Sequence, residues 1–216
     1  MSARNILVAV GAVLVLAGAA QAAGNVQITE WMYSGTNGEF IEFTNVGDAP
    51  IDLTNWSYSD SARVPGSVNF GSVFGVVGVW ESIIFTETDP NIFRTAWGLP
   101  SSVKVFGPNT VQNIGRSDEI NIYDALSQLI DRLTYNDQAG MGPRTQYAAC
   151  TVPFADLNLT SASGAWVLAS VGDAYGSWAS TGGDIGNPGV YVPEPGGLAA
   201  LAGGFLALTA WIKRRK

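Results

Sequence analysis

The sequence contains no histidine and a single cysteine, Cys150. Without histidine the chain cannot build a Ser-His-Asp triad, a Cys-His dyad or a His-ligated zinc site. One cysteine excludes an intrachain disulfide, and we interpret Cys150 as a small buried apolar residue, with pairing between chains or modification as the alternative. The sequence also lacks a GxxxxGK[ST] phosphate loop and a GxGxxG motif between a strand and a helix. Catalysis by carboxylates that are distant in sequence stays open.

The first 22 residues have the composition of a secretory signal peptide. Arg4 precedes a short apolar run over residues 6–20, and Ala20-Gln21-Ala22 offers the small-x-small pattern that signal peptidase accepts. The run is too short for a typical membrane-spanning helix. We therefore predict a signal peptide over residues 1–22 and export through the inner membrane, with a retained N-terminal anchor as the alternative.

The chain between the two apolar ends is strongly acidic. Six of the eleven Lys and Arg residues but seventeen of the eighteen Asp and Glu residues lie between Ala23 and Val192, so this body has a net charge of −11. Nucleic-acid binding depends on cationic side chains that neutralise phosphates. We expect no nucleic-acid partner.

The body has the pattern of an all-β protein. Short alternating segments are separated by clusters rich in Gly, Asn, Asp and Pro, which is typical of a β-sandwich or barrel. In the first segment, Val26, Ile28 and Met32 are expected on one side. The expected strands are VQITEWMY, EFIEFTN, NWSYS, WESIIFT, VKVF, EINIYD, LIDRLTY and AWVLAS. These strands predict one sandwich domain over residues 23–178.

Three further segments have recognisable local signals. Residues 89–99 predict a helix with Asp89 as N-cap, Pro90 at its first position and Gly98 at its end. Residues 119–135 predict a hairpin linked by Asp124–Gln128. The Gly-rich residues 179–191 predict a linker or closing segment between the domain and the tail.

Two kinds of residue are candidates for ligand binding in the body. Loop carboxylates suit calcium, and the weak candidates are Asp118, Asp173 and Asp184, although none belongs to a DxDxDG array. Trp97, Trp166 and Trp178 border loops and are candidates for ligand contact, whereas Trp31, Trp56 and Trp80 lie in strand patterns and are expected to pack in the core. We expect no cofactor other than this calcium.

Most of the body, from Val26 to Gly189, carries a combination of strand and turn motifs that is typical of one domain family. Residues 26–60 contain an I-x-E strand, a W/F-I-E-L-x-N strand and a G-x-x-x-x-D/N-L-x-x-W segment, here Ile28–Glu30, Phe40–Asn45 and Gly47–Trp56. This combination resembles the lamin tail domain family. Residues 114–137 match the family's hairpin, although Ser127 stands where Gly is usual, and Val77-Gly78-Val79 replaces the usual Pro-Ala-Gly before WESIIFT. GDIGNPG, residues 183–189, resembles the Pro-Gly segment that closes many of these domains. The resemblance implies an immunoglobulin-like β-sandwich that acts as an interaction or accessory module.

The C-terminal tail, residues 192–216, combines three features. Pro193, Glu194 and Pro195 form a Pro-Glu-Pro motif, an apolar stretch over residues 196–212 predicts a single transmembrane helix, and Arg214 and Arg215 form a basic end. With these features the tail is similar to the PEP-CTERM sorting signal of Gram-negative bacteria. The resemblance implies recognition by an exosortase, which processes substrates associated with exopolysaccharide and biofilm. A plain single-pass anchor is the alternative.

These features together predict an exported, non-enzymatic surface or matrix protein. Signal peptidase and an exosortase would process it, the C-terminal helix would hold it in the membrane transiently, and the sandwich would meet exopolysaccharide or other surface proteins. A glycan- or calcium-binding adhesin and a carboxylate-dependent hydrolase are the alternative functions.

Overall fold

The computed structural model describes residues 24–192. The predicted signal peptide with Ala20 and Ala22 lies outside these residues. The sorting motif of Pro193, Glu194 and Pro195, the helix predicted over residues 196–212, and Arg214 and Arg215 also lie outside them. No helix within residues 24–192 has the length and apolar character needed to span a membrane.

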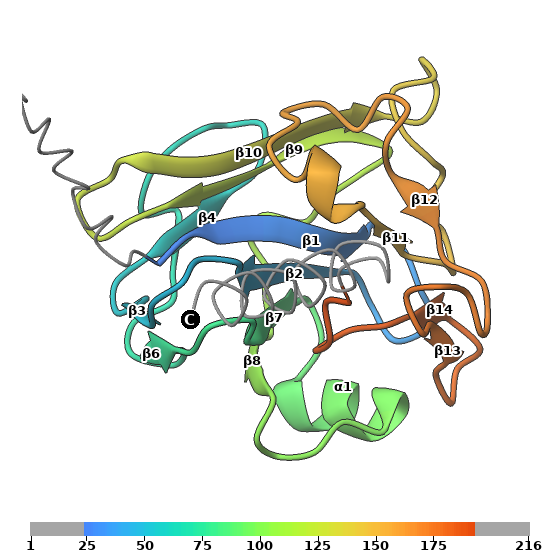
Figure 1. The fold of residues 1–216 in the computed structure, drawn as a ribbon, viewed down its shortest axis with the longest axis horizontal. Helices are drawn as coiled ribbons and strands as arrows, with labels where there is room; N and C mark the ends of the chain where they lie inside the picture. The colour runs from blue at the N-terminus through green and yellow to red at the C-terminus, as the bar shows by residue number, and fades with distance from the viewer. Residues whose placement is uncertain (1–23, 193–216) are drawn as a thin grey trace, which may run out of the picture.

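Two antiparallel sheets form the body of the protein (Figure 1). The larger has the order β12-β11-β1-β2-β7-β8, in which only the β7–β8 pair is parallel. Its strands are β1 Val26–Met32, β2 Phe40–Asn45, β7 Ser82–Thr86, β8 Lys104–Phe106, β11 Cys150–Thr151 and β12 Val167–Leu168. The smaller has the order β10-β9-β4-β5, with β4 Ser57–Ser59, β5 Val68–Asn69, β9 Ser117–Tyr123 and β10 Leu129–Asn136. The predicted all-β, immunoglobulin-like sandwich is confirmed.

The remaining elements are short. Two small ribbons pair β3 Ile51–Asp52 with β6 Val76–Val77 and β13 Trp178–Ala179 with β14 Ile185–Gly186. The helices are α1 Pro90–Trp97 and the 3-10 turn η1 Phe154–Asp156. In α1 the Asp89 side chain accepts hydrogen bonds from the backbone N–H groups of Asn91 and Ile92, and Gly98 ends the helix with a φ of 66°. The helix and both of its predicted caps are confirmed.

The main core lies between the two sheets. Trp31 of β1 is fully buried and stacks on Tyr135 of β10, with ring centroids 3.9 Å apart. Cys150 belongs to the same core and is a free, buried cysteine, as its interpretation as an apolar residue predicted. Aromatic and β-branched residues dominate the larger sheet because their side chains pack well on a pleated surface.

A β-bulge in β1 changes which side chains enter this core. The pairing of β1 with β2 shifts register between Ile28 and Glu30, so the alternation of β1 is interrupted at Thr29. Ile28 and Trp31 face the main core, whereas Met32 packs in a second core on the other side of the sheet. The prediction that Ile28 and Met32 share a face was therefore wrong.

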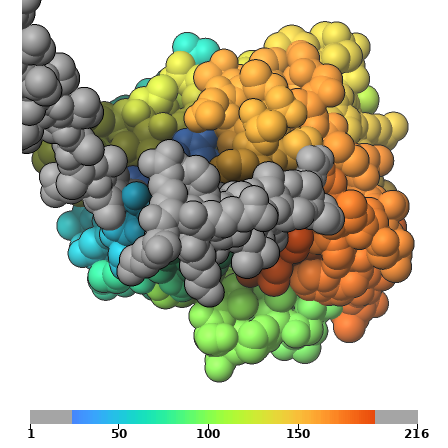
Figure 2. All heavy atoms as spheres, in the orientation of Figure 1, coloured from blue at the N-terminus to red at the C-terminus, as the bar shows by residue number. Residues whose placement is uncertain are grey.

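The second core covers the outer face of the larger sheet. Phe40 and Ile84 from that sheet pack there against Phe93 and Trp97 of α1. Figure 1 shows the resulting layers: the smaller sheet, the larger sheet, and then α1 with the C-terminal part of the described chain. Figure 2 shows the last third of the described chain, coloured orange to red, as a continuous band over one side of the molecule.

Residues 179–191, predicted as a linker or closing segment, are part of the domain and close it. The segment contains β14, and Asp184, Asn187 and Tyr191 within it are buried. The Tyr191 hydroxyl donates to the Val152 carbonyl at 2.9 Å. We name residues 184–191 the closing segment, and the domain extends to it rather than ending at residue 178. Glycine content alone predicted flexibility, but these glycines allow close contact with the sheet.

Candidate interaction surfaces

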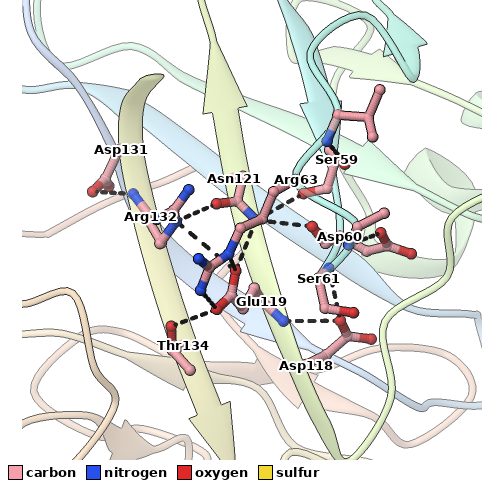
Figure 3. Close-up of polar contacts among 12 residues, drawn as sticks. Ser59, Asp60, Ser61, Arg63, Asp118, Glu119, Asn121, Asp131, Arg132 and Thr134 are labelled. Atoms are coloured by element: carbon pink, nitrogen blue, oxygen red, sulfur yellow. Dashed lines mark hydrogen bonds and ion pairs between the residues drawn. The ribbon is translucent and has the colours of Figure 1, made fainter. Parts of the chain in front are cut away.

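The outer face of the smaller sheet carries a network of charged side chains centred on Glu119 (Figure 3). Arg63 approaches Glu119 with two nitrogen atoms, Nε donating at 2.7 Å. Arg132 forms an ion pair with Glu119 at 3.8 Å, and the Thr134 hydroxyl donates to Glu119 at 3.1 Å. Hydrogen bonds from Arg63, and then from Asn121 and Thr134, lower the pKa of Glu119 to about 2. Glu119 therefore stays ionised near neutral pH and acts as the centre of an ion-pair network.

Asp118 lies next to this network and lines a pocket of about 230 Å³ together with Glu119 and Ser61. Its Oδ1 atom accepts from the backbone N–H groups of Ser61 and Glu119, and its Oδ2 atom accepts from that of Gly115. A general acid near neutral pH needs a raised pKa, whereas the pKa of Glu119 is lowered. Glu119 is therefore not a general acid near neutral pH.

Two buried carboxyl groups on the opposite face of the protein hold the closing segment. Glu30 of β1 accepts a hydrogen bond from the backbone N–H of Asn187 at 2.8 Å, and Glu42 of β2 accepts one from that of Gly189 at 2.7 Å. The backbone N–H of Tyr191 then donates to the Ser82 hydroxyl of β7 at 3.3 Å. Asn187, Gly189 and Tyr191 are thus hydrogen-bonded to β1, β2 and β7, respectively. The closing segment therefore crosses these three strands in turn.

Burial dominates the electrostatics of these two carboxyl groups. Desolvation raises the pKa of Glu42 to about 7. Desolvation, followed by the nearby charge of Glu42, raises the pKa of Glu30 well above its usual value. A strongly perturbed carboxyl group is often catalytic when it lies in a cleft. Glu30 and Glu42 are instead buried under the closing segment, where their role is structural.

Asp184 connects the closing segment to the loop between β1 and β2. Its two carboxylate oxygens accept from the backbone N–H groups of Thr36 and Asn37, both at 2.9 Å, and the Asn37 side chain also donates to it. Asp173 similarly accepts from Ser170, Tyr175 and Ser177 of its own loop. Within residues 24–192 no three acidic, His or Cys side chains gather to hold a metal ion. The calcium candidates Asp118, Asp173 and Asp184 are thus not brought together, and each accepts hydrogen bonds from loop backbone N–H groups.

The tryptophans predicted to contact a ligand do not form an exposed row. Trp97 is 2% exposed and Trp166 is 8% exposed, because Trp97 packs against Phe40 in the second core and Trp166 against Trp31 in the main core. Trp178 is half-buried, and its Nε1 donates to the Trp97 carbonyl at 3.0 Å. The prediction of ligand contact was wrong for Trp97 and Trp166, since both indole rings are covered by the domain.

Trp80 is the exposed tryptophan that sequence reasoning placed in the core. Its residue is 41% exposed and has a φ of 61°, a left-handed conformation that is rare for a bulky residue. Trp80 lies in the turn that precedes β7, which begins only at Ser82. The available signal was Val77-Gly78-Val79, a turn sequence directly before Trp80.

A comparison with protein-family models identifies the family to which this architecture belongs. The lamin tail domain model matches residues 19–137, more than half of the chain. The chain belongs to the lamin tail domain family. No curated protein and no solved structure matches the chain. Membership supports an immunoglobulin-like protein-interaction module.

The lamin tail match ends next to β10, and residues 138–192 complete the domain after it. These later residues supply β11, β12, η1 and the closing segment, so they contribute the edge of the larger sheet and the cover of its outer face. The family's hairpin is formed as predicted, with the link Asp124–Gln128 between β9 and β10. Ser127 has a φ of 63°, which explains why Gly is the usual lamin tail residue there.

Proposed function

We propose that this lamin tail domain protein is an exported, non-enzymatic component of the cell surface or extracellular matrix, whose sandwich binds exopolysaccharide or another surface protein. The family match carries the proposal of an interaction module. The body of the chain is acidic and would repel the phosphates of a nucleic acid, which favours other classes of partner. The strongly perturbed carboxyl groups Glu30 and Glu42 serve to hold the closing segment, which favours binding over hydrolysis as the function.

Export and sorting depend on the two ends of the chain. We infer that signal peptidase cleaves after Ala22, that the apolar residues 196–212 hold the protein in the membrane transiently, and that an exosortase then processes the tail. The Pro-Glu-Pro motif begins two residues after Tyr191, the last buried residue of the closing segment. A motif in this position follows the folded domain directly, so processing there would leave both cores and the closing segment whole.

The processing step predicts the composition of the released protein. Mass spectrometry of protein from the medium should detect the body but no peptide that extends beyond the Pro193–Pro195 motif. Replacing Pro193, Glu194 and Pro195 together with alanine should keep the full-length chain, including Lys216, in the membrane fraction. The control is Pro65→Ala at an exposed turn of the body. Intact Lys216 in the released wild-type protein would contradict processing.

Matrix association is the direct test of the interaction function. The whole 216-residue chain, labelled with a tag and incubated with extracellular matrix from producing cells, should sediment with the matrix and be depleted from the supernatant. A heat-unfolded sample of the same chain is the control for non-specific adsorption. Equal depletion of folded and unfolded protein, or no depletion of either, would exclude matrix binding as the function.

A further inference from the structure

A small pocket opens at the end of the larger sheet, where β1 begins and β2 ends. Its volume is about 270 Å³, and it is lined by Asn25, Gln27, Phe154, Leu157 and Asn158 among others. We name it the amide pocket. In Figure 2 the start of β1, in blue, reaches the surface beside the orange segment that contains η1. The volume is near the lower limit of about 300 Å³ for ligand pockets, which suits a single small ring.

Gln27 carries a hydrogen-bond acceptor that the described residues leave unused. The residue is only 7% exposed, and its Nε2 atom donates to Asn25 Oδ1 at 2.9 Å, which fixes the orientation of the amide. Its Oε1 atom is buried and has no partner within residues 24–192. A buried acceptor without a donor costs about 1–3 kcal/mol. Gln27 lines the pocket, so a ligand hydroxyl group that reaches this oxygen would satisfy it.

One exposed aromatic ring lines the same pocket, and a second exposed ring packs against the first. Phe154 lines it and is 44% exposed, and the Trp80 ring lies next to Phe154 with centroids 5.6 Å apart. Tyr191 of the closing segment stacks behind Trp80 at 6.4 Å with an angle of 14° between the rings. The strained backbone at Trp80 is held by a hydrogen bond from its N–H to the Asn45 carbonyl at 2.7 Å. Such strain is concentrated at functional sites in proteins.

The residues that line the pocket are uncharged, although the body around it is strongly acidic. We propose that the amide pocket and its rim of Phe154 and Trp80 form a subsite for one neutral sugar residue of a polysaccharide. Amide side chains both donate and accept hydrogen bonds, as sugar hydroxyl groups do. The apolar C–H face of a pyranose ring would lie on the exposed aromatic rings.

The inference rests on the proposed function in that it names a class of partner for the same domain. A peptide is a weaker fit, because peptides are commonly bound by addition to an exposed sheet edge. The pocket instead lies at the end of β1 and β2, which are interior strands of the larger sheet. A charged polysaccharide is also a weaker fit, since none of the described lining residues can pair with its charge.

The test measures binding of the whole chain to defined neutral sugars. Trisaccharides of glucose, mannose, galactose and N-acetylglucosamine, and deproteinised neutral polysaccharide from the producing cells, are titrated in a zwitterionic detergent and followed by saturation-transfer NMR. We expect at least one of these probes to bind. Gln27→Leu and Trp80→Asn should each weaken that binding about tenfold, the equivalent of one lost hydrogen bond or stacking contact.

The control variant is Tyr147→Asn. Tyr147 is 53% exposed and has a φ of 63°, so it matches Trp80 in exposure and backbone conformation, but it does not line the amide pocket. Asn tolerates this conformation, so Trp80→Asn and Tyr147→Asn should both fold, as an unchanged melting temperature would verify. Tyr147→Asn should bind as the wild type does.

The possible outcomes separate this inference from the proposed function. Binding of none of the probes, or equal binding by Gln27→Leu, Trp80→Asn and the wild type, would overturn the sugar subsite. If Gln27→Leu and Trp80→Asn bind the sugars as the wild type does and also sediment with matrix, the matrix function stands while the subsite does not. If matrix binding is lost when the matrix is treated with protease, the partner is a protein and the subsite is overturned.

Discussion

The domain is expected to lose several kcal/mol of stability between about pH 5 and about pH 8. Burial raises the pKa of four carboxyl groups in the folded protein: to about 6 for Asp131, about 7 for Glu42, about 8 for Glu39, and well above its usual value for Glu30. Between the unfolded and folded pKa values the folded protein binds more protons, so raising the pH favours unfolding. One pKa unit corresponds to about 1.4 kcal/mol, so Glu42 alone contributes on the order of 3 kcal/mol.

Glu119 has the opposite effect at lower pH. Its folded pKa is lowered to about 2 by the hydrogen bonds from Arg63, so its contribution to stability is present above the unfolded value of 4.5 and is lost as the pH falls below it. Together, these two effects place the maximum of the free energy of unfolding at about pH 5, close to the pKa values of carboxyl groups in the unfolded chain.

Urea unfolding at a series of pH values measures this dependence. Glu39→Gln removes one titrating group but keeps an amide oxygen that can accept from the backbone N–H of Ile114, as Glu39 does at 2.8 Å. This variant should lose less stability than the wild type as the pH rises. Asp52→Asn is the control, because Asp52 is exposed and its pKa is lowered by hydrogen bonds from Thr54. A free energy of unfolding that is constant or increases up to pH 8 would contradict the account.

The second large expected effect is a loss of about 3 kcal/mol or more in Asp184→Ala. Asp184 is fully buried and accepts from the backbone N–H groups of Thr36 and Asn37, which the substitution would leave without an acceptor. Hydrogen bonds to charged groups contribute about 1.5–3 kcal/mol each, and buried unpaired donors add a penalty. Thermal or urea unfolding of the variant measures the loss.

A control variant and a chelator separate this anchoring role from calcium binding. Asp52→Ala also removes two hydrogen bonds from a carboxylate, but both come from the exposed Thr54 of its own turn. Its stability should change by less than about 1 kcal/mol. If Asp184 acts as an anchor, EDTA should leave the melting temperature of the wild type unchanged. A melting temperature that falls in EDTA and is restored by calcium would show that the carboxylate is a metal ligand.

Local signals in the sequence were sufficient for the helix and for eight of the strands, but not for the two-residue strands β3, β5, β6, β11, β13 and β14. α1 was predicted with both caps because Asp89, Pro90 and Gly98 act through contacts within a few residues. The link Asp124–Gln128 was predicted for the same reason. The bulge at Thr29 was missed because it depends on the pairing of β1 with β2, which the alternation of one strand does not reveal.

The burial of polar and Gly-rich segments was the feature that the sequence predicted least well. Residues 179–191 were predicted as a linker or closing segment because they contain few large aliphatic side chains, and the hydrogen bonds to Glu30 and Glu42 that hold them on the sheet could not be predicted. Trp97 and Trp166 were expected at a binding surface, whereas α1 and the residues after β11 place them in the two cores. Trp80 and Gln27 were missed as surface candidates because each belongs to a segment with a strand pattern.

The closing segment also determines how the domain would respond to mechanical tension. A pull on the chain after Val192 reaches Tyr191 first, then Gly189, then Asn187, and these residues are bonded to three different strands. The three hydrogen bonds would therefore carry the force and break one after another, rather than all at once. Because Tyr191 also packs in the main core, its release is the step that first exposes core surface. A domain held by its C-terminal end in flowing liquid would thus have a length of chain that extends and absorbs force before it unfolds.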